Sequence, residues 1–167
     1  MTPQSRLLDI GAGAGFPGIP LKIYYPEMPV VAVDAVAKKI MFLRQLCRVL
    51  GLEHVECMTV RLNPSSLTPR QDDKSRQQDS LLQRRYFDLI VARAVGPIPR
   101  LIELAAPFLA PHGHIILQRG RDGKHEVREH QAFLQDSGFH LVEMIEVTFS
   151  FFTYPRYLML FRCHRAG

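Results

Sequence analysis

The chain has 167 residues, and its 47% hydrophobic content predicts one globular domain, 1–167, and excludes a fibrous or fully disordered chain. Its 21 Lys and Arg residues against 16 acidic residues give a net charge of +5, which permits nucleic-acid binding without proving it. Three widely spaced cysteines form neither a disulfide framework nor a metal pattern, and no leader or membrane-spanning run is visible. We therefore expect a cytoplasmic protein without a metal site.

The first predicted strand, Leu7–Ile10, is an apolar run that ends at a glycine-rich turn. Gly11, Gly13 and Gly15 allow backbone conformations that a side chain would block, so a ligand can approach the main chain. The spacing differs by one residue from the Gly-x-Gly-x-x-Gly pattern of dinucleotide sites, which disfavours an NAD-linked function. With Asp9, the pattern Asp-x-Gly-x-Gly-x-Gly resembles motif I of the class I methyltransferases, which bind S-adenosylmethionine; a simple tight loop is the alternative.

A short helix at Leu21–Tyr25 leads to a second buried strand, Val30–Val33, which ends at Asp34. An acidic residue at this place, roughly 20 residues past the glycines, can accept hydrogen bonds from both ribose hydroxyls of a nucleoside. Asp34 is therefore the candidate for ribose binding. The alternative is that Asp34 caps the following helix, since Asp is a favoured N-cap residue.

The following helix is predicted over 35–50, with Gly51 as its stop signal. Lys38 and Lys39 lie near its first turn, where the helix dipole disfavours cations. Contact with a nucleic-acid phosphate would explain their position. A solvated helix face is the alternative.

The rest of the chain continues to alternate strands and helices, which predicts an α/β fold with a mostly parallel sheet. Three more strands and two helices are predicted, at Val55–Val60, Tyr86–Ala92, His114–Gln118, Ile98–Leu109 and Glu126–Ser137. The last two apolar runs, Leu141–Val147 and Tyr157–Arg162, are expected to pair as an antiparallel hairpin at one edge of the sheet. The polar stretch 63–85 cannot bury a core and is predicted to be a mobile loop.

Several segments carry a more specific resemblance than the glycine pattern alone. They are Phe-Pro-Gly-Ile-Pro-Leu-Lys at 16–22, Lys38-Lys39 and Phe42-Leu43 after Asp34, the run 87–95 that ends in Arg-Ala-Val, and the Gly113 turn before Arg119-Gly120. The chain resembles the bacterial ribosomal RNA small-subunit methyltransferase G family, also called glucose-inhibited division protein B, and the match covers most of the chain. The resemblance implies a Rossmann-like class I S-adenosylmethionine-dependent methyltransferase fold with an antiparallel C-terminal edge.

The resemblance also implies an activity, which is transfer of a methyl group from S-adenosylmethionine to the N7 of a guanine in 16S rRNA. The partner would be 16S rRNA or a small ribosomal subunit precursor, and we expect a monomer. Guanine N7 already carries a lone pair, so alignment of the reactants suffices and no catalytic acid or base is expected.

The resemblance also implies site residues, by their position in the family's motifs, and the ribose argument adds Asp34. Cofactor contacts are expected from Gly11, Gly13, Phe16, Asp34, Leu62, Asn63 and Arg93. Substrate contacts, through phosphate, are expected from Lys38, Lys39 and Arg119. The alternatives are a core position for Phe16 and a surface salt bridge for Arg93.

Three features depart from the pattern of that family. Motif I begins within the first ten residues, so we expect the family's helical segment before it to be missing. The family's Arg-Ala-Glu after the third strand reads Arg61-Leu62-Asn63, and the loop at 63–85 is longer. An amide thus replaces a carboxylate. Two other functions therefore stay open: a class I methyltransferase with another substrate, and a truncated, non-catalytic RNA-associating remnant.

Overall fold

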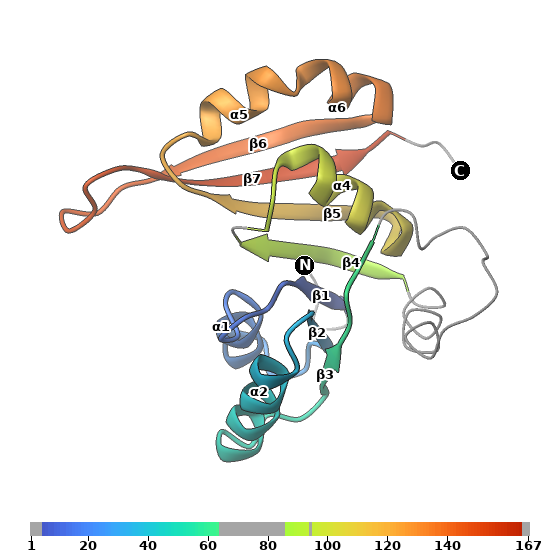
Figure 1. The fold of residues 1–167 in the computed structure, drawn as a ribbon, viewed down its shortest axis with the longest axis vertical. Helices are drawn as coiled ribbons and strands as arrows, with labels where there is room; N and C mark the ends of the chain where they lie inside the picture. The colour runs from blue at the N-terminus through green and yellow to red at the C-terminus, as the bar shows by residue number, and fades with distance from the viewer. Residues whose placement is uncertain (1–4, 64–85, 94, 165–167) are drawn as a thin grey trace.

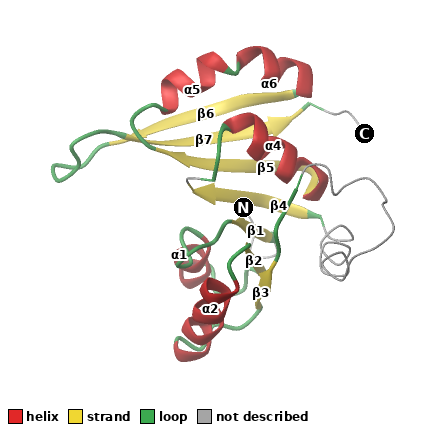
Figure 2. Ribbon diagram, viewed as in Figure 1, coloured by secondary structure: helices red, strands yellow, loops and turns green. Residues whose placement is uncertain are grey.

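One seven-stranded sheet runs through the residues that this computed structural model describes, which are 5–63, 86–93 and 95–164 (Figures 1 and 2). Its strands are β1 (Leu7–Ile10), β2 (Val30–Asp34), β3 (Val55–Thr59), β4 (Phe87–Arg93), β5 (Leu109–Arg119), β6 (Phe139–Val147) and β7 (Arg156–Cys163). Their order in space is β3-β2-β1-β4-β5-β7-β6. Strands β1 to β5 are parallel, and β7 is antiparallel to both of its neighbours.

Strand β1 lies at the point where the strand order reverses. Its Asp9 is opposite Ala32 of β2 on one side and opposite Val91 of β4 on the other. In open sheets of this kind, ligands bind outside the carboxyl ends of the strands that flank such a point. The topology thus directs the search for a site to the residues that follow β1, β2 and β4.

Helices cover both faces of the sheet. They are α1 (Gly18–Tyr24), α2 (Ala37–Val49), α4 (Ile98–Ala105), α5 (Gly123–Glu129) and α6 (Gln131–Ser137). On one face, Ile19 of α1 and Leu43 of α2 pack against Ala32 of β2. On the other face, Leu101 of α4 packs in the same buried cluster as Leu8 of β1. Because successive strand residues point to opposite faces, a strand buried on both sides is apolar, as β2 is up to its last residue, Asp34.

The structure confirms the mostly parallel sheet and the C-terminal hairpin, and corrects two helices. The helix predicted over 98–109 ends at Ala105, is followed by a 3-10 turn (Ala106–Phe108), and Leu109 already belongs to β5. Pro107 lies at the break, where its missing N–H cannot continue an α-helix. The helix predicted over 126–137 is two helices, separated by His130 at φ −103°.

One predicted element lies almost entirely outside the residues that the structure describes. The predicted mobile loop at 63–85 lies outside the described residues, apart from Asn63. Within the described ranges, no helix combines the length and the apolar character needed to cross a membrane.

Candidate functional site

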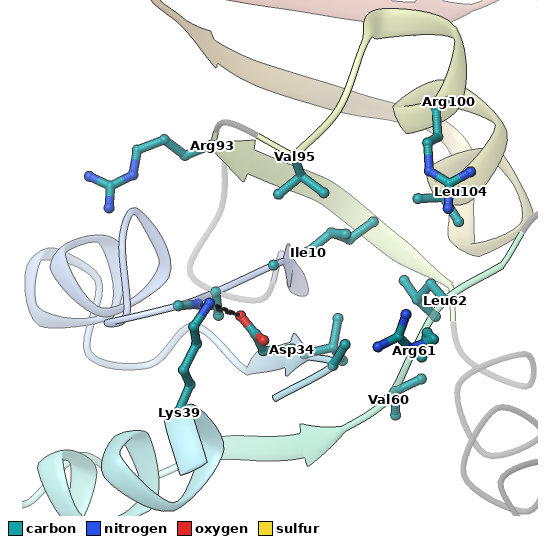
Figure 3. Close-up of a pocket in the computed structure, with 15 residues that line it drawn as sticks. Ile10, Asp34, Lys39, Val60, Arg61, Leu62, Arg93, Val95, Arg100 and Leu104 are labelled. Atoms are coloured by element: carbon teal, nitrogen blue, oxygen red, sulfur yellow. Dashed lines mark hydrogen bonds and ion pairs between the residues drawn. The ribbon is translucent and has the colours of Figure 1, made fainter. Parts of the chain in front are cut away.

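A cavity of about 500 Å³ opens at the carboxyl ends of β1, β2 and β4 (Figure 3). Its lining combines the glycine turn after β1 with apolar and charged side chains from several other elements. The lining residues are Ile10, Gly11, Ala12, Gly13, Val33, Asp34, Ala35, Lys39, Val60, Arg61, Leu62, Arg93, Val95, Arg100 and Leu104. This volume is within the range of roughly 300–1,000 Å³ that small-molecule sites occupy.

The glycine turn exposes main chain to this cavity. Gly11 and Gly13 have φ angles of +70° and +58°, in the left-handed region that favours glycine. A Cβ atom at Gly11 would overlap the side chain of Val95, whereas a Cβ at Gly13 would meet the Gly11 oxygen at 3.7 Å and, apart from its chain neighbours, no closer atom of the described residues. Gly15 does not line the cavity, and a Cβ there would meet Ile19 at 2.6 Å. The first two glycines therefore shape the cavity, and the third allows close packing of α1.

Asp34 lies at the end of β2 with its carboxylate among donors. Its Oδ2 accepts a hydrogen bond from the backbone N–H of Gly13 (3.1 Å) and pairs with Lys39 Nζ at 3.5 Å. Its Oδ1 accepts from the backbone N–H of Val36 (2.9 Å). The N-cap residue of α2 is Val36 and not Asp34, so the alternative that Asp34 caps this helix is wrong. The carboxylate instead ties the glycine turn to the segment before α2.

Arg93 ends β4 beside the same cavity. Its guanidinium carbon lies 5.2 Å from the ring centroid of Phe16, a cation–π contact that leaves Phe16 49% exposed. The core alternative for Phe16 is therefore wrong. No carboxylate within the described part of the chain forms an ion pair with Arg93, so the salt-bridge alternative receives no support there. Phe16 does not itself line the cavity.

Asp9 is fully buried at the start of the motif. Its Oδ2 accepts a hydrogen bond from the backbone N–H of Gly18 (2.9 Å), while Oδ1 has no partner among the described residues. Burial raises the pKa of Asp9 to about 6, although the Gly18 hydrogen bond and the charge of Arg93 act in the opposite direction. A Cβ atom at Gly18 would lie 2.6 Å from Asp9 Oδ2, so glycine is required there for the contact.

The other predicted site residues differ in whether they line the cavity. Leu62 lines the cavity, whereas Asn63 is exposed and does not line it. Lys39 lines the cavity through its ion pair with Asp34, and Lys38 is exposed on the first turn of α2. The sequence thus placed two neighbouring lysines in one role, and the structure separates them.

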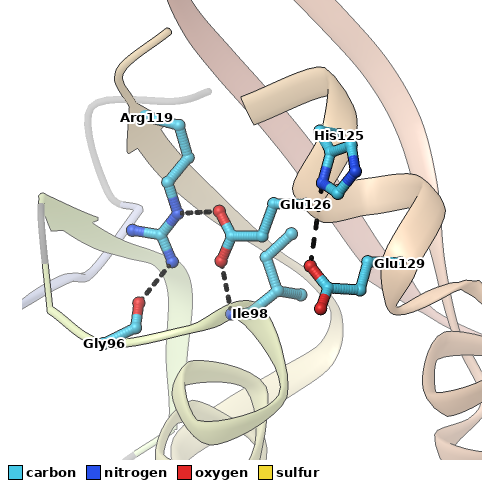
Figure 4. Close-up of polar contacts among 6 residues, drawn as sticks. All are labelled: Gly96, Ile98, Arg119, His125, Glu126 and Glu129. Atoms are coloured by element: carbon cyan, nitrogen blue, oxygen red, sulfur yellow. Dashed lines mark hydrogen bonds and ion pairs between the residues drawn. The ribbon is translucent and has the colours of Figure 1, made fainter. Parts of the chain in front are cut away.

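Arg119 has a different environment from Arg93, although it also ends a strand (Figure 4). It is only 8% exposed, and its Nε donates to Glu126 Oε2 at 2.9 Å. Its Nη2 donates to the Gly96 oxygen at 2.9 Å, and Glu126 Oε1 accepts from the backbone N–H of Ile98 at 2.8 Å. Arg119 and Glu126 therefore fasten the start of α4. The predicted phosphate contact of Arg119 stays a prediction.

Nine of the residues that line the cavity were not predicted as site residues from the sequence: Ile10, Ala12, Val33, Ala35, Val60, Arg61, Val95, Arg100 and Leu104. Three of them directly follow β3 or lie shortly after β4, at the edge where ligands bind in parallel sheets, and this rule could have found them. Arg100 and Leu104 are four residues apart on α4, so they share one face of that helix. Nothing in the sequence indicated which face of α4 would border the cavity.

The fold and this cavity together define a class. A solved structure of a SAM-dependent methyltransferase from Aquifex aeolicus superimposes with a TM-score of 0.66 at 19% identity, over 94% of this chain and 81% of that one. The ribosomal protein L11 methylase of Lactobacillus delbrueckii gives a TM-score of 0.66 at 16% identity, over 98% and 72% of the two chains. The fold is that of the class I methyltransferases.

Sequence comparison then identifies the family. The family model of the rRNA small subunit methyltransferase G (GidB) matches residues 1–150, and the chain belongs to this family. The ribosomal RNA small subunit methyltransferase G of Geobacter sulfurreducens is 38% identical over 148 residues, which are 89% of this chain and 62% of the relative. The chain therefore spans about three fifths of the length of that relative. The resemblance seen in the sequence is confirmed.

Proposed function

We propose that this chain binds S-adenosylmethionine in the cavity around Gly11 and Asp34 and transfers its methyl group to the N7 of a guanine in 16S rRNA. The observation that carries the proposal is the pairing of exposed glycine main chain with the Asp34 carboxylate in one cavity, in a chain of this family. We further propose that 1–167 is one methyltransferase domain that acts as a cytoplasmic monomer. Its partner would be 16S rRNA or a small ribosomal subunit precursor.

The residues around the cavity fit this cofactor. Each carboxylate oxygen can accept more than one hydrogen bond, so Asp34 retains capacity for two ribose hydroxyls beside its backbone donors. Leu62, Val95 and Leu104 give the cavity apolar walls that suit an adenine base. The open space beside Gly13 leaves room for the ligand close to main chain.

The proposed reaction requires no proton transfer by the protein. When bound, S-adenosylmethionine supplies an electrophilic methyl group: its S–CH3 bond breaks as the N7–CH3 bond forms, which leaves a neutral thioether and places the positive charge on the guanine. Guanine N7 carries no proton, so the residues of this chain bind and orient the two reactants. Arg93 would serve this orientation from the end of β4, since it lines the cavity and has no carboxylate partner in the described ranges.

Basic residues outside the cavity would position the RNA. Lys38 is exposed and close to Lys39, and phosphate contacts of this kind fix register without reading sequence. Arg119 would contact phosphate through Nη1, because its Nε and Nη2 already donate to Glu126 and to the Gly96 oxygen. Asn63 and Phe16 would act at the rim, because neither lines the cavity.

Calorimetry and methyl transfer test the proposal together. We expect the chain to bind S-adenosylmethionine and to form 7-methylguanosine in unmodified small ribosomal subunits, detected by mass spectrometry of digested RNA. Asp34→Asn should weaken cofactor binding about tenfold, because it removes the charge from the hydrogen bonds to ribose. Failure to bind either S-adenosylmethionine or its demethylated product would overturn the proposal.

Two further outcomes would replace parts of the proposal. Label found in protein or in another RNA, with cofactor binding intact, would indicate a class I methyltransferase with another substrate. Salt-sensitive RNA binding without any cofactor binding would indicate a non-catalytic RNA-associating protein.

A further inference from the structure

A second cavity, of about 480 Å³, lies on the other side of Arg93. Arg93 lines both cavities, so the two cavities are neighbours at the end of β4. The wall of this second cavity is formed by the end of β5 with Gln118, by the start of β7 with Arg156, and by Phe149 and Phe152 of the turn that joins β6 to β7. No residue assigned to cofactor binding, apart from Arg93, lines it.

The turn at 148–155 carries an aromatic cluster. The rings of Phe149 and Phe151 are nearly parallel, with centroids 5.3 Å apart and 6° between their planes. The ring of Phe152 meets both edge-on, at 5.4 Å and 4.8 Å. Phe149 and Phe151 are nonetheless exposed, and Phe151 is 76% exposed. Aromatic rings that leave the core at a loop tip provide flat faces for a ligand rather than packing for the fold.

Arginines are interleaved with these rings. The guanidinium carbon of Arg156 lies 5.3 Å from the Phe152 ring centroid, and that of Arg121 lies 4.8 Å from the Tyr154 ring centroid. Among the residues that the structure describes, no acidic one lines the second cavity. Asp122, which pairs with Arg121 at 3.4 Å, is an acidic neighbour outside it. The surface therefore combines aromatic faces with positive charge.

The strand pairing places this surface at the edge where the proposed reaction would occur. Strand β7 is antiparallel to β5, and Tyr157 at its start is opposite Arg119 at the end of β5. The β6–β7 turn therefore extends beyond the carboxyl ends of β4 and β5, as Figure 1 shows. A nucleotide bound under the turn would lie next to Arg93, which also borders the first cavity.

We infer that the β6–β7 turn and the second cavity bind single-stranded RNA, with one nucleobase stacked on Phe149 and Phe152 beside Arg93 and with phosphates held by Arg156 and Arg121. The inference deepens the proposed function and rests on it only for the identity of the reaction that follows. Single-stranded RNA is recognised by stacking of its bases on aromatic rings and by arginine contacts, and this turn offers both. A protein partner would suit an apolar patch with less clustered positive charge.

Equilibrium binding of a fluorescent, unstructured oligoribonucleotide to the full chain tests the inference. Phe149→Ala and Phe152→Ala should each weaken binding about fivefold or more, the loss that follows removal of one stacking ring. Phe149→Tyr should retain binding, because it keeps the ring. An abasic oligomer of the same length should bind more weakly and should be indifferent to the two alanine substitutions, since it has no base to stack.

Tyr24→Ala is the matched control. Tyr24 on α1 is 76% exposed, as Phe151 is, and lies outside both cavities. RNA binding that is unchanged in both phenylalanine variants, or that falls equally in Tyr24→Ala, would overturn the inference. The inference would also be overturned if the phenylalanine variants lost methyl transfer to a protein substrate and kept their RNA binding.

The outcome is distinguishable from that of the proposed function. Cofactor binding, measured by calorimetry, should be the same in Phe149→Ala as in the unchanged chain, because this residue does not line the first cavity. A chain that binds RNA through the turn but never binds S-adenosylmethionine would contradict the proposed reaction and leave the RNA surface in place.

Discussion

Two neighbouring parallel strands end in arginine at the same edge of the sheet, yet the two arginines have opposite environments. Arg93 at the end of β4 is exposed, lies over Phe16 and borders two cavities. Arg119 at the end of β5 is buried and bonded to Glu126 and to the Gly96 oxygen. One positive charge is available to a ligand, and the other stabilises the fold.

The difference shows what a strand-end position determines. It places both side chains at the ligand-binding edge, because parallel strands share the same carboxyl edge. Whether the charge stays available depends on a carboxylate from elsewhere in the chain. Glu126, on α5, neutralises Arg119 and also accepts from the backbone N–H of Ile98, so the environment of Arg119 is decided by a helix that packs from another part of the chain.

The largest effect on stability is expected from the end of β5. Arg119→Ala leaves Glu126 without its partner in a partly buried place and should lower the free energy of unfolding by about 3 kcal/mol. Arg93→Ala should lower it by less than about 1 kcal/mol, since its main contact is a cation–π pair at the surface. Urea denaturation of both variants measures the difference. Equal losses would contradict the division of roles between the two arginines.

A second expected effect concerns the burial of Asp9 beside Arg93. Its folded pKa of about 6 is above the ordinary value of 3.8 for an aspartate, so the folded state binds more protons than the unfolded state between these values. Stability should therefore fall as pH rises from about 4 to about 6, by up to about 3 kcal/mol, and stay lower above this window.

Asp9→Asn isolates this contribution. The variant has no carboxylate to ionise, so the difference in unfolding free energy between it and the unchanged chain should vary with pH only in that window. Denaturation curves at pH 4, 5, 6 and 8 provide the measurement. A constant difference across the four pH values would show that burial does not perturb Asp9.

The glycine turn allows a test in which a second left-handed glycine, outside the cavity, serves as the control. Gly13→Ala and Gly51→Ala both place a side chain on a left-handed backbone, at φ +58° and +63°, and each should cost about 1 kcal/mol of stability. Only Gly13 lines the cavity, so only Gly13→Ala should also weaken S-adenosylmethionine binding. Calorimetry on the two variants separates strain from obstruction, and an equal effect on binding would remove Gly13 from the site.

Substitution of Arg93 is expected to have the smallest effect on the stability of the fold and a clear effect on ligand binding. Arg93→Ala should weaken binding of S-adenosylmethionine, of RNA, or of both by about tenfold, because a charged contact to a ligand contributes on this scale. Arg93→Lys keeps the charge but loses the planar guanidinium, so its partial rescue would indicate a charge contact. Unchanged affinity for both ligands would leave the end of β4 without a functional role.

Much of this arrangement could be predicted from the sequence. The apolar run before Gly11 and the one that ends at Asp34 each form the expected strand, and both residues line the cavity. Local patterns determine these positions, since a strand followed by a glycine turn has few alternatives. The helix over 98–109 was overextended, because apolar residues continued through Pro107 into β5 and periodicity alone could not mark the change.

Other features depend on contacts between distant residues, which local pattern does not contain. The assignment of Arg119 to substrate took no account of Glu126, and the pairing of the two appears only when α5 packs. Arg100 and Leu104 reach the cavity because α4 packs with one face toward it. The aromatic residues at 149–154 drew no functional interpretation from the sequence, since their significance depends on the strand order that places the turn beside Arg93.

Lys22 adds a consequence for chemical labelling of this protein. Its side chain is almost fully enclosed, and Nζ donates to the backbone oxygens of Pro26 and Met28, which closes the turn between α1 and β2. Burial lowers the pKa of this amine, yet enclosure denies reagents access to it. Amine-directed acylation of the native protein should therefore pass over Lys22 while marking exposed lysines, and the appearance of label on it would report that the turn ahead of β2 has opened.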